Sequence, residues 1–159
     1  MNILKIIIAL ISRLLKRKEE AEPGEWWETN LPTSQEVITG TDLWKLLNEK
    51  FPNVPLYLSD ALYLLAKYDD IALFLAQDQT NKFEYKSQSF DCDNFSYRLM
   101  GQFSVPEWSA LTFGIMWTQK HALNIVVTED KEVFFVEPQA DELLAEPKGS
   151  WGGIRFIIM

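Results

Sequence analysis

The sequence has a single cysteine, no internal repeat, no low-complexity tract and no long apolar run. One cysteine excludes an internal disulfide framework, which is compatible with a reducing compartment. The longest unbroken apolar run, residues 6–11, is far shorter than the roughly 20 residues that a membrane-spanning helix needs. These absences favour an ordinary globular chain without a spanning segment.

Basic charge is also scarce over most of the chain. The sequence has 15 Lys and Arg against 23 Asp and Glu, a formal net charge of −8. Residues 1–18 hold five of the basic residues and no acid, so the remainder has 10 basic against 23 acidic residues, or −13. Nucleic-acid binding depends on neutralising phosphates, so this composition excludes nucleic acid as a partner.

The 159 residues, 47% hydrophobic and 13% aromatic, suit one globular domain with an appended segment. Residues 1–18 have one broad apolar face and a basic end, which predicts an amphipathic helix. It would bind a membrane surface, a partner protein or its own domain, or form part of a signal peptide. The charged, Pro- and Gly-broken stretch that follows makes residues 19–40 a linker, and residues 41–159 the domain.

The pattern of the domain changes from helical to strand-like along the chain. A helix capped by Thr41 and a second one beginning near Asp69 or Asp70 come first. Strand patterns follow at residues 111–118, 121–127, 133–137 and 154–159, with a long loop at residues 140–153. Helices followed by an antiparallel sheet predict an α+β fold.

The only cysteine lies where a helix is predicted to begin. Asp91 is a good N-cap, and Phe95, Leu99 and Phe103 follow at helical spacing, so one helix face would be buried. Cys92 is then the first helical residue, where the helix dipole favours the thiolate, the nucleophilic form of the side chain. The sequence therefore predicts a reactive thiol at a helix N-terminus.

The only histidine and a glutamate can meet on neighbouring strands. His121 begins one predicted strand and Glu137 ends the next. Two registers of this strand pair would bring them together: in one the numbers of two paired residues sum to 258, and in the other to 260. In both, the side chains of His121 and Glu137 lie on the same face of the sheet, directly opposite or diagonal to each other, roughly 5 to 8 Å apart at Cβ. Cys92 would then be the nucleophile, His121 the base and Glu137 the group that orients the imidazole.

These residues support a family resemblance. The strings DCDNF, HALNIVV and VEPQ resemble the papain-like and transglutaminase-like cysteine peptidases, including the protease domain of the Marasmius oreades agglutinin, over roughly residues 55–159. The resemblance implies a papain-like cysteine peptidase fold: a helical N-terminal part, with the nucleophile helix packed on an antiparallel sheet. It further implies a cysteine hydrolase that acts on a peptide or protein substrate through a thioester, with acyl transfer to an amine as a sub-case.

Further groups have weaker candidate roles. The backbone N–H of Cys92 and the side chain of Gln88 are candidate donors to an oxyanion. Asp91 and Asp93 would raise the pKa of the thiol, or cap the helix, or hold a cation. The sequence requires no cofactor, whereas the resemblance implies calcium or manganese.

A non-catalytic reading stays open beside the enzyme. A lone buried cysteine is usually a small apolar residue, and the domain would then be an interaction module tethered by residues 1–18 to a membrane, a virion or a partner protein. Either reading is compatible with a cytoplasmic or virion-associated protein that binds a membrane surface peripherally.

Overall fold

A computed structural model describes residues 26–27 and 30–159. The chain forms two compact units, Met1–Asn30 and Leu31–Met159. In the first unit, the backbone N–H and Nδ2 of Asn30 both donate to the carbonyl oxygen of Trp26. The predicted amphipathic helix and the first part of the predicted linker lie outside the described residues.

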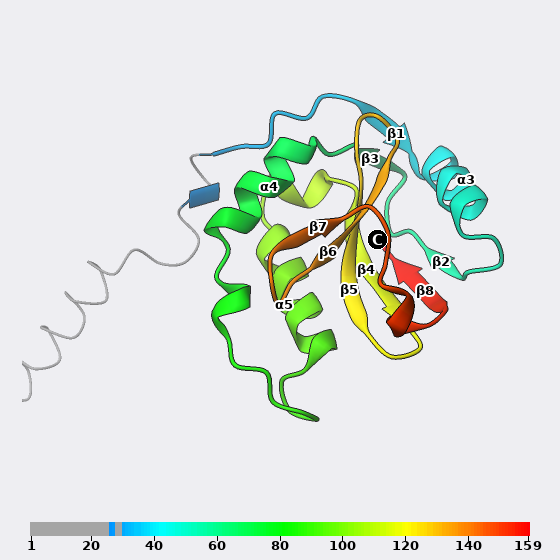
Figure 1. Cartoon of the computed structure of the whole chain (residues 1–159). Coiled ribbons are helices and arrows are strands. Elements are labelled where there is room, and N and C mark those ends of the chain that lie inside the picture. The colour runs from blue at the N-terminus through cyan, green and yellow to red at the C-terminus, as the bar shows by residue number, and fades with distance from the viewer. Residues whose placement is uncertain (1–25, 28–29) are drawn as a thin grey trace, which may run out of the picture. The chain divides into compact units, whose positions relative to one another are not determined.

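The second unit combines three α-helices with eight strands among its described residues (Figure 1). None of the helices in residues 26–27 and 30–159 is long and apolar enough to cross a membrane. In chain order the elements are β1 (Val37–Thr39), α3 (Gly40–Lys50), β2 (Leu56–Tyr57), β3 (Leu62–Leu64), α4 (Tyr68–Gln77), the 3-10 helix η1 (Thr80–Lys82), α5 (Cys92–Phe103), η2 (Trp108–Ala110), β4 (Phe113–Thr118), β5 (Ala122–Val127), β6 (Val133–Glu137), β7 (Glu142–Leu144), η3 (Gly149–Trp151) and β8 (Ile154–Ile158).

Six of these strands form one mixed sheet in the order β2-β8-β4-β5-β6-β7. The predicted antiparallel sheet is wrong in this respect, because β2 pairs in parallel with β8. Two strands of this sheet are too short to show an alternation in the sequence: β2 has two residues and β7 has three. Their pairing partners, rather than their own residues, decide that they are strands.

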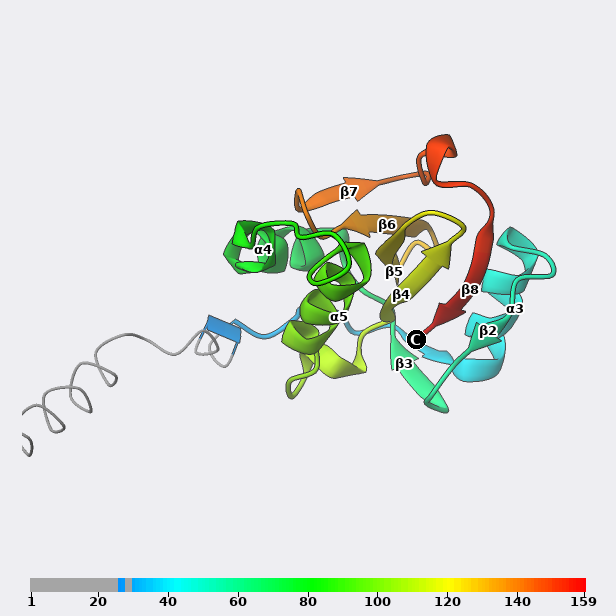
Figure 2. The ribbon, with the colours of Figure 1, turned by 90° about the horizontal axis from the view of Figure 1, so that it is seen from below.

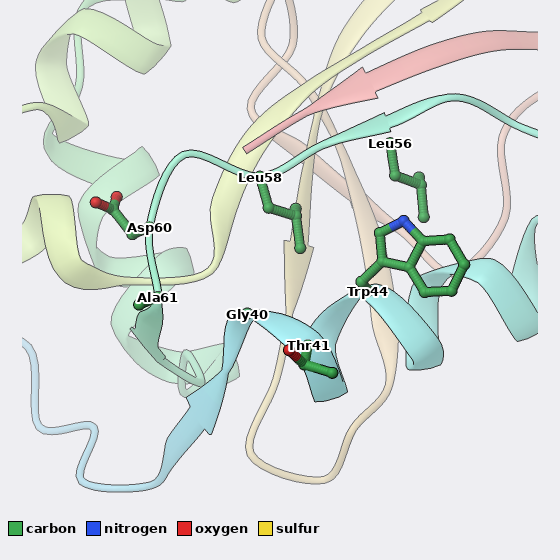
Figure 3. A pocket seen from close by; sticks show the side chains of 7 residues that line it. All are labelled: Gly40, Thr41, Trp44, Leu56, Leu58, Asp60 and Ala61. Carbon is green, nitrogen blue, oxygen red and sulfur yellow. The ribbon is translucent and has the colours of Figure 1, made fainter.

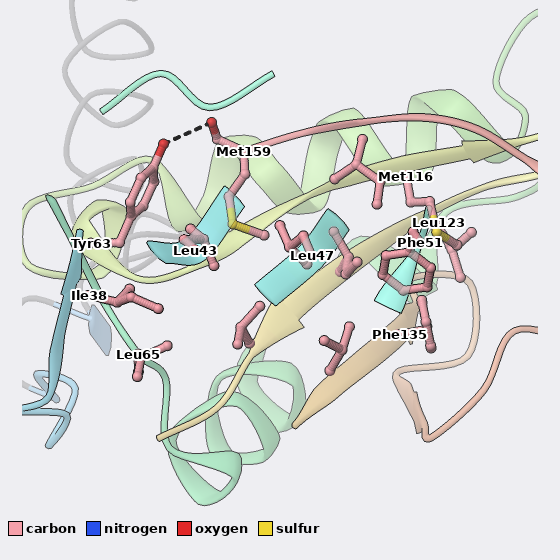
Figure 4. Close-up of a cluster of buried hydrophobic side chains, with 14 residues drawn as sticks. Ile38, Leu43, Leu47, Phe51, Tyr63, Leu65, Met116, Leu123, Phe135 and Met159 are labelled. Carbon is pink, nitrogen blue, oxygen red and sulfur yellow. Dashed lines mark hydrogen bonds between the residues drawn. The ribbon is translucent and has the colours of Figure 1, made fainter. Parts of the chain in front are cut away.

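Helix α3 covers one face of the sheet. Leu43 and Leu47, both 0% exposed, pack with Met116, Leu123 and Ile157 in the main hydrophobic cluster (Figure 4). Because side chains alternate along a strand, every second residue of β4 and β5 faces this helix. Tyr63 also belongs to this cluster, and its hydroxyl donates a hydrogen bond to the carbonyl oxygen of Met159, the last residue of the chain, at 3.2 Å.

Helix α5 covers the opposite face, beside β4 and β5 (Figure 2). Phe103, the last residue of α5, stacks on Phe113 with ring centroids 3.8 Å apart and on Phe74 of α4 at 3.9 Å. Phe113 pairs with Val126, near the end of β5. The carboxyl end of α5 is therefore fixed beside the carboxyl end of β5.

The second compact unit begins at Leu31, and the division into a linker of residues 19–40 and a domain of residues 41–159 stays a prediction. Asp70 on α4 is buried and accepts hydrogen bonds from the backbone N–H of Thr33 at 2.7 Å and from the Ser34 hydroxyl at 3.3 Å. Strand β1 then pairs antiparallel with β3. Residues 31–40 are therefore held in place by residues that lie later in the chain. The composition of residues 31–40 alone does not predict these contacts.

Candidate functional site

The helix that carries the cysteine begins as the sequence predicts. Helix α5 starts at Cys92 with Asp91 as its N-cap. The backbone N–H of Asp91 donates to Oδ1 of Asn94 at 3.1 Å, and the Ser96 hydroxyl donates to the carbonyl oxygen of Cys92 at 3.0 Å. Cys92 is a free, half-buried cysteine. Its thiol therefore belongs to a partly exposed residue at the N-terminus of a capped helix.

Two carboxyl groups flank this cysteine. A hydrogen bond between their side chains lowers the pKa of the Asp91 carboxyl and raises the pKa of the Asp93 carboxyl. Asp91 Oδ2 also accepts the backbone N–H of Gln88 at 3.1 Å. Asp91 therefore carries the charge of the pair and shapes the turn before the helix. The Gln88 side chain is exposed, and its role as an oxyanion donor stays a prediction.

The histidine and the glutamate make direct contact. His121 Nε2 lies 2.6 Å from Glu137 Oε2, with 12% and 8% of the two side chains exposed. The pairing of Asn124 with Val136 gives a sum of 260, the second of the two predicted registers. In this register Leu123 lies opposite Glu137, and His121 lies diagonally to it. A hydrogen bond between charged partners is strong when it is shielded from water in this way.

Further groups, which the sequence did not predict, contact His121 or Glu137. The Trp151 ring stacks on the His121 ring, with centroids 4.5 Å apart. The backbone N–H of His121 donates to the Thr118 hydroxyl oxygen at 3.0 Å, and that of Gln139 donates to Glu137 Oε1 at 3.2 Å. Trp151 belongs to the long loop predicted before the last strand, and no local pattern indicates that this loop folds back over the histidine.

The structure brings the cysteine to the same end of the sheet as the histidine but not into hydrogen-bond contact with it. Asn124 Nδ2 donates to the carbonyl oxygen of Ser96 at 3.2 Å, so the first turns of α5 lie beside the first residues of β5. Cys92 is one turn earlier, toward His121. Among the described residues, however, no hydrogen bond joins the Cys92 thiol to the His121 ring.

The predicted metal ligands are Asp91 and Asp93, and the described residues do not complete a ligand set around them. In the part of the chain that the structure describes, no group of three or more His, Cys, Asp or Glu side chains could hold a metal ion. Asp91 and Asp93 are explained instead by their mutual hydrogen bond and by the helix start. Their role as cation ligands remains a prediction.

A second feature is an open groove between α3 and the loop that follows β2, about 510 Å³ in volume (Figure 3). The Trp44 indole, 45% exposed, faces Leu56 across it. Gly40 lines the groove where a Cβ atom would come within 2.6 Å of the Asp60 carbonyl oxygen. A half-exposed indole beside a hydroxyl group, that of Thr41, is a surface for a ligand with one apolar face and one polar edge.

Comparisons with known proteins found likeness in structure only. No protein-family model and no curated protein sequence matches the chain. One similar structure is a Polyporus squamosus lectin, PSL1a, described as its complex with E64: TM-score 0.67, 26% identity, 79% of this chain and 51% of that chain. Another is a Polyporus squamosus lectin described as bound to the human-type influenza-binding epitope Neu5Acα2-6Galβ1-4GlcNAc: TM-score 0.65, 24% identity, 79% and 50%. The chain spans about half the length of the structures it matches.

These comparisons overturn the family predicted from the sequence. Both matches are lectin structures, and neither is described as a papain-like peptidase. The papain-like fold, the cysteine hydrolase activity and the peptide or protein substrate are therefore corrected. The physical reason is that DCDNF, HALNIVV and VEPQ specify a helix cap and a strand register. Local geometry of this kind does not by itself determine a family or an activity.

Proposed function

We propose that this chain is a ligand-binding module in which Cys92, His121 and Glu137 form one site for covalent capture of an electrophilic ligand. The observation that carries the proposal is the 2.6 Å contact between His121 and Glu137 at the end of the sheet where α5 begins. Cys92 at the helix N-terminus contributes the thiol. Neither hydrolysis nor a peptide substrate is part of the proposal.

Each side chain has a defined part in the capture step. Glu137 holds the His121 ring and stabilises its protonated form, and the imidazole takes the proton of the Cys92 thiol. With an epoxide, the sulfur forms a bond to one ring carbon while the bond from that carbon to oxygen breaks. The oxygen then receives the proton from His121, so the adduct is neutral at that atom. The imidazole must approach the thiol for this step, and such contacts are often long in a ligand-free protein.

One similar structure supports the choice of ligand. It is described as a PSL1a complex with E64. E64 is an epoxide reagent, and a thiolate is the nucleophile that opens an epoxide. E64 is therefore the probe for the first experiment. Intact-mass measurement of the full chain after incubation with E64 at pH 7 should show one adduct, located on Cys92 by peptide mapping.

Two variants complete the test. Cys92→Ser should form no adduct, and His121→Ala should form it at least about tenfold more slowly, since removing a general base typically costs 10²- to 10⁴-fold. Lys120→Ala, an exposed neighbour of the histidine, should react as the wild type does. Slow labelling of the wild type, or labelling that His121→Ala leaves unchanged, would mean that the thiol is a packing residue.

A second candidate function is glycan binding in the groove beside α3. The observation that favours it is the Trp44 indole, 45% exposed above an open groove with the Thr41 hydroxyl nearby. A sugar ring has an apolar face that can stack on the indole and hydroxyl groups that can bond along its edge. The glycan named for one similar structure, Neu5Acα2-6Galβ1-4GlcNAc, is a rational first probe.

Calorimetric titration of the full chain with that trisaccharide tests this candidate. Binding that Trp44→Ala abolishes and that Tyr57→Ala leaves intact would support it, because Tyr57 is an even more exposed aromatic residue. An absence of heat at millimolar trisaccharide, or binding unaffected by Trp44→Ala, would contradict it.

A further inference from the structure

An aromatic strip crosses from helix α5 over β4 to β8. It consists of Tyr97 on α5, Trp117 on β4 and Phe156 on β8. The rings of Trp117 and Phe156 stack with their centroids 4.7 Å apart and an interplanar angle of 22°. The centroid of the Tyr97 ring lies 5.6 Å from that of Trp117. The three rings therefore form one continuous surface built from a helix and two strands.

The aromatic strip lies on the face of the sheet opposite to α3. Trp117 and Phe156 are paired residues of β4 and β8. The adjacent pair, Met116 with Ile157, belongs to the hydrophobic cluster that α3 covers. Because side chains alternate along a strand, the Trp117 and Phe156 rings point to the other face. Tyr97 is 50% exposed and the other two rings belong to partly exposed residues, so a ligand can reach the strip.

A β-bulge brings a positive charge to the same surface. Trp117 on β4 pairs with Phe156 on β8. The next residue of β4, Thr118, pairs with Ile154, which leaves Arg155 without a partner in the ladder. A bulge re-aims the side chain of its extra residue, and the Arg155 guanidinium lies over the Phe156 ring, 6.0 Å from its centroid. Arg155 is exposed, and among the described residues no carboxylate forms an ion pair with it.

The aromatic strip adjoins the proposed thiol site. Tyr97 follows Cys92 by five residues on the same helix, which is about 7.5 Å along the helix axis. On the sheet side, Trp117 pairs with Ala122, the residue that follows His121. The strip therefore begins on the two elements that carry the thiol and the imidazole, α5 and the end of the β4–β5 pair.

We propose that the aromatic strip recognises the ligand that Cys92 captures, and that this ligand carries an aromatic ring and a negative charge. The inference rests on the thiol capture proposed above. The ring stacks on the exposed rings of the strip, and its carboxylate pairs with the Arg155 guanidinium, whose planar donors suit that group. A neutral apolar ligand is less favourable, because it would cover Arg155 and leave its charge without a partner.

Three alkylating reagents test the strip separately from the thiol. They are iodoacetamide, iodoacetanilide, which adds a phenyl ring, and 4-(iodoacetamido)benzoate, which adds a ring and a carboxylate. In each reaction the sulfur forms a bond to the methylene carbon, the carbon–iodine bond breaks, iodide leaves and the thiol proton passes to His121. Intact-mass measurement of the full chain at pH 7 gives each rate, which is divided by the rate of the same reagent with N-acetylcysteine. The normalised rate should rise about five- to tenfold from iodoacetamide to the benzoate, with iodoacetanilide between them.

Two variants and one control assign the gain to the strip. Tyr97→Ala, at a half-exposed position, should lower the rates of both ring-bearing reagents several-fold relative to the iodoacetamide rate. Arg155→Gln should lower the rate of the benzoate to that of iodoacetanilide, because the charge pairing is lost. The control is Tyr68→Ala, an aromatic residue of similar exposure on α4, which should leave the three normalised rates as in the wild type.

The outcomes separate this inference from the thiol capture on which it rests. Equal normalised rates for the three reagents would mean that the rings only pack on one another, and would overturn the strip while the thiol capture stands. Slow labelling of Cys92 by all three reagents would overturn both. A dimer in size-exclusion chromatography that Tyr97→Ala dissociates would assign the strip to a second copy of the chain, and would likewise overturn the proposal.

Discussion

Glu137 at the end of β6 lies diagonally across from His121 at the start of β5, and the contact of 2.6 Å between Glu137 Oε2 and His121 Nε2 is shielded by the Trp151 ring. The register that allows it follows from one backbone pairing, Asn124 with Val136. A shift by one residue would turn Glu137 to the opposite face of the sheet. The contact is thus a consequence of strand register as much as of residue type.

The first prediction concerns the charge of this pair. Glu137→Gln should keep the fold and lower the free energy of unfolding by about 1 to 3 kcal/mol, because a neutral amide replaces a charge-assisted hydrogen bond in a buried place. It should also slow alkylation of Cys92 by iodoacetamide. Denaturant unfolding and labelling followed by mass spectrometry measure the two effects.

The matched control is Glu142→Gln, an exposed glutamate that pairs with Glu137 on the neighbouring strand. It should change neither quantity appreciably. If Glu137→Gln labels as fast as the wild type, Glu137 has no part in the thiol chemistry.

The second prediction concerns the aromatic stack under α5. Phe103→Ala should destabilise the domain by about 3 to 5 kcal/mol, since a ring packed against Phe74, Trp108 and Phe113 is replaced by a cavity. Chemical denaturation followed by circular dichroism gives the difference. Leu73→Ala, on the exposed side of α4, serves as control and should cost far less. A loss below about 1 kcal/mol in Phe103→Ala would contradict this packing.

The third prediction concerns the first residues of the second unit. Asp70→Asn should lower the free energy of unfolding by about 1 to 3 kcal/mol, because the amide nitrogen cannot accept all the bonds that Thr33 and Ser34 donate. It should also raise hydrogen exchange in residues 31–36. Asp69→Asn, its exposed neighbour, should change neither. Unchanged exchange in Asp70→Asn would mean that this segment is held by other contacts.

The fourth prediction is a pH dependence of the stability of the fold, caused by the Asp141 carboxyl. The folded-state pKa of Asp141, about 6, lies above its ordinary value of 3.8, so the folded chain binds this proton more tightly than the unfolded chain does. The stabilising contribution is therefore fully present below pH 4 and is lost as the pH rises toward and through 6. Measuring the Tm of the wild type and of Asp141→Asn from pH 4 to 7 isolates this contribution. The Tm of the variant should exceed that of the wild type by an amount that grows with pH. A difference that is constant over this range would contradict the raised pKa.

The sequence determined the local structure around the thiol. Asp91 with its short polar side chain, followed by Phe95, Leu99 and Phe103 at helical spacing, was enough to predict that α5 begins at Cys92 and buries that face. The apolar patterns of β4, β5, β6 and β8 likewise predicted their positions within about two residues. Such patterns work because helix caps and side-chain alternation depend on near neighbours in the chain.

Other features depended on partners far away in sequence. Thr39 rather than Thr41 caps α3, because β1 extends the chain up to that residue and leaves its hydroxyl free to accept the N–H of Asp42. Strands β2 and β7 exist through pairing with β8 and β6. The family inferred from three short strings was corrected by likeness over most of the chain, because short strings record local geometry only.

Residue types and spacing by themselves determined that Cys92 begins a helix and that His121 and Glu137 can share a face. Only the tertiary structure decided between the two registers and placed Trp151 over the imidazole. It alone brought Asp141 to Asn81 across 60 residues. Contacts of this kind are set by how α5, the sheet and the turns pack on one another, and packing depends on all the residues at once.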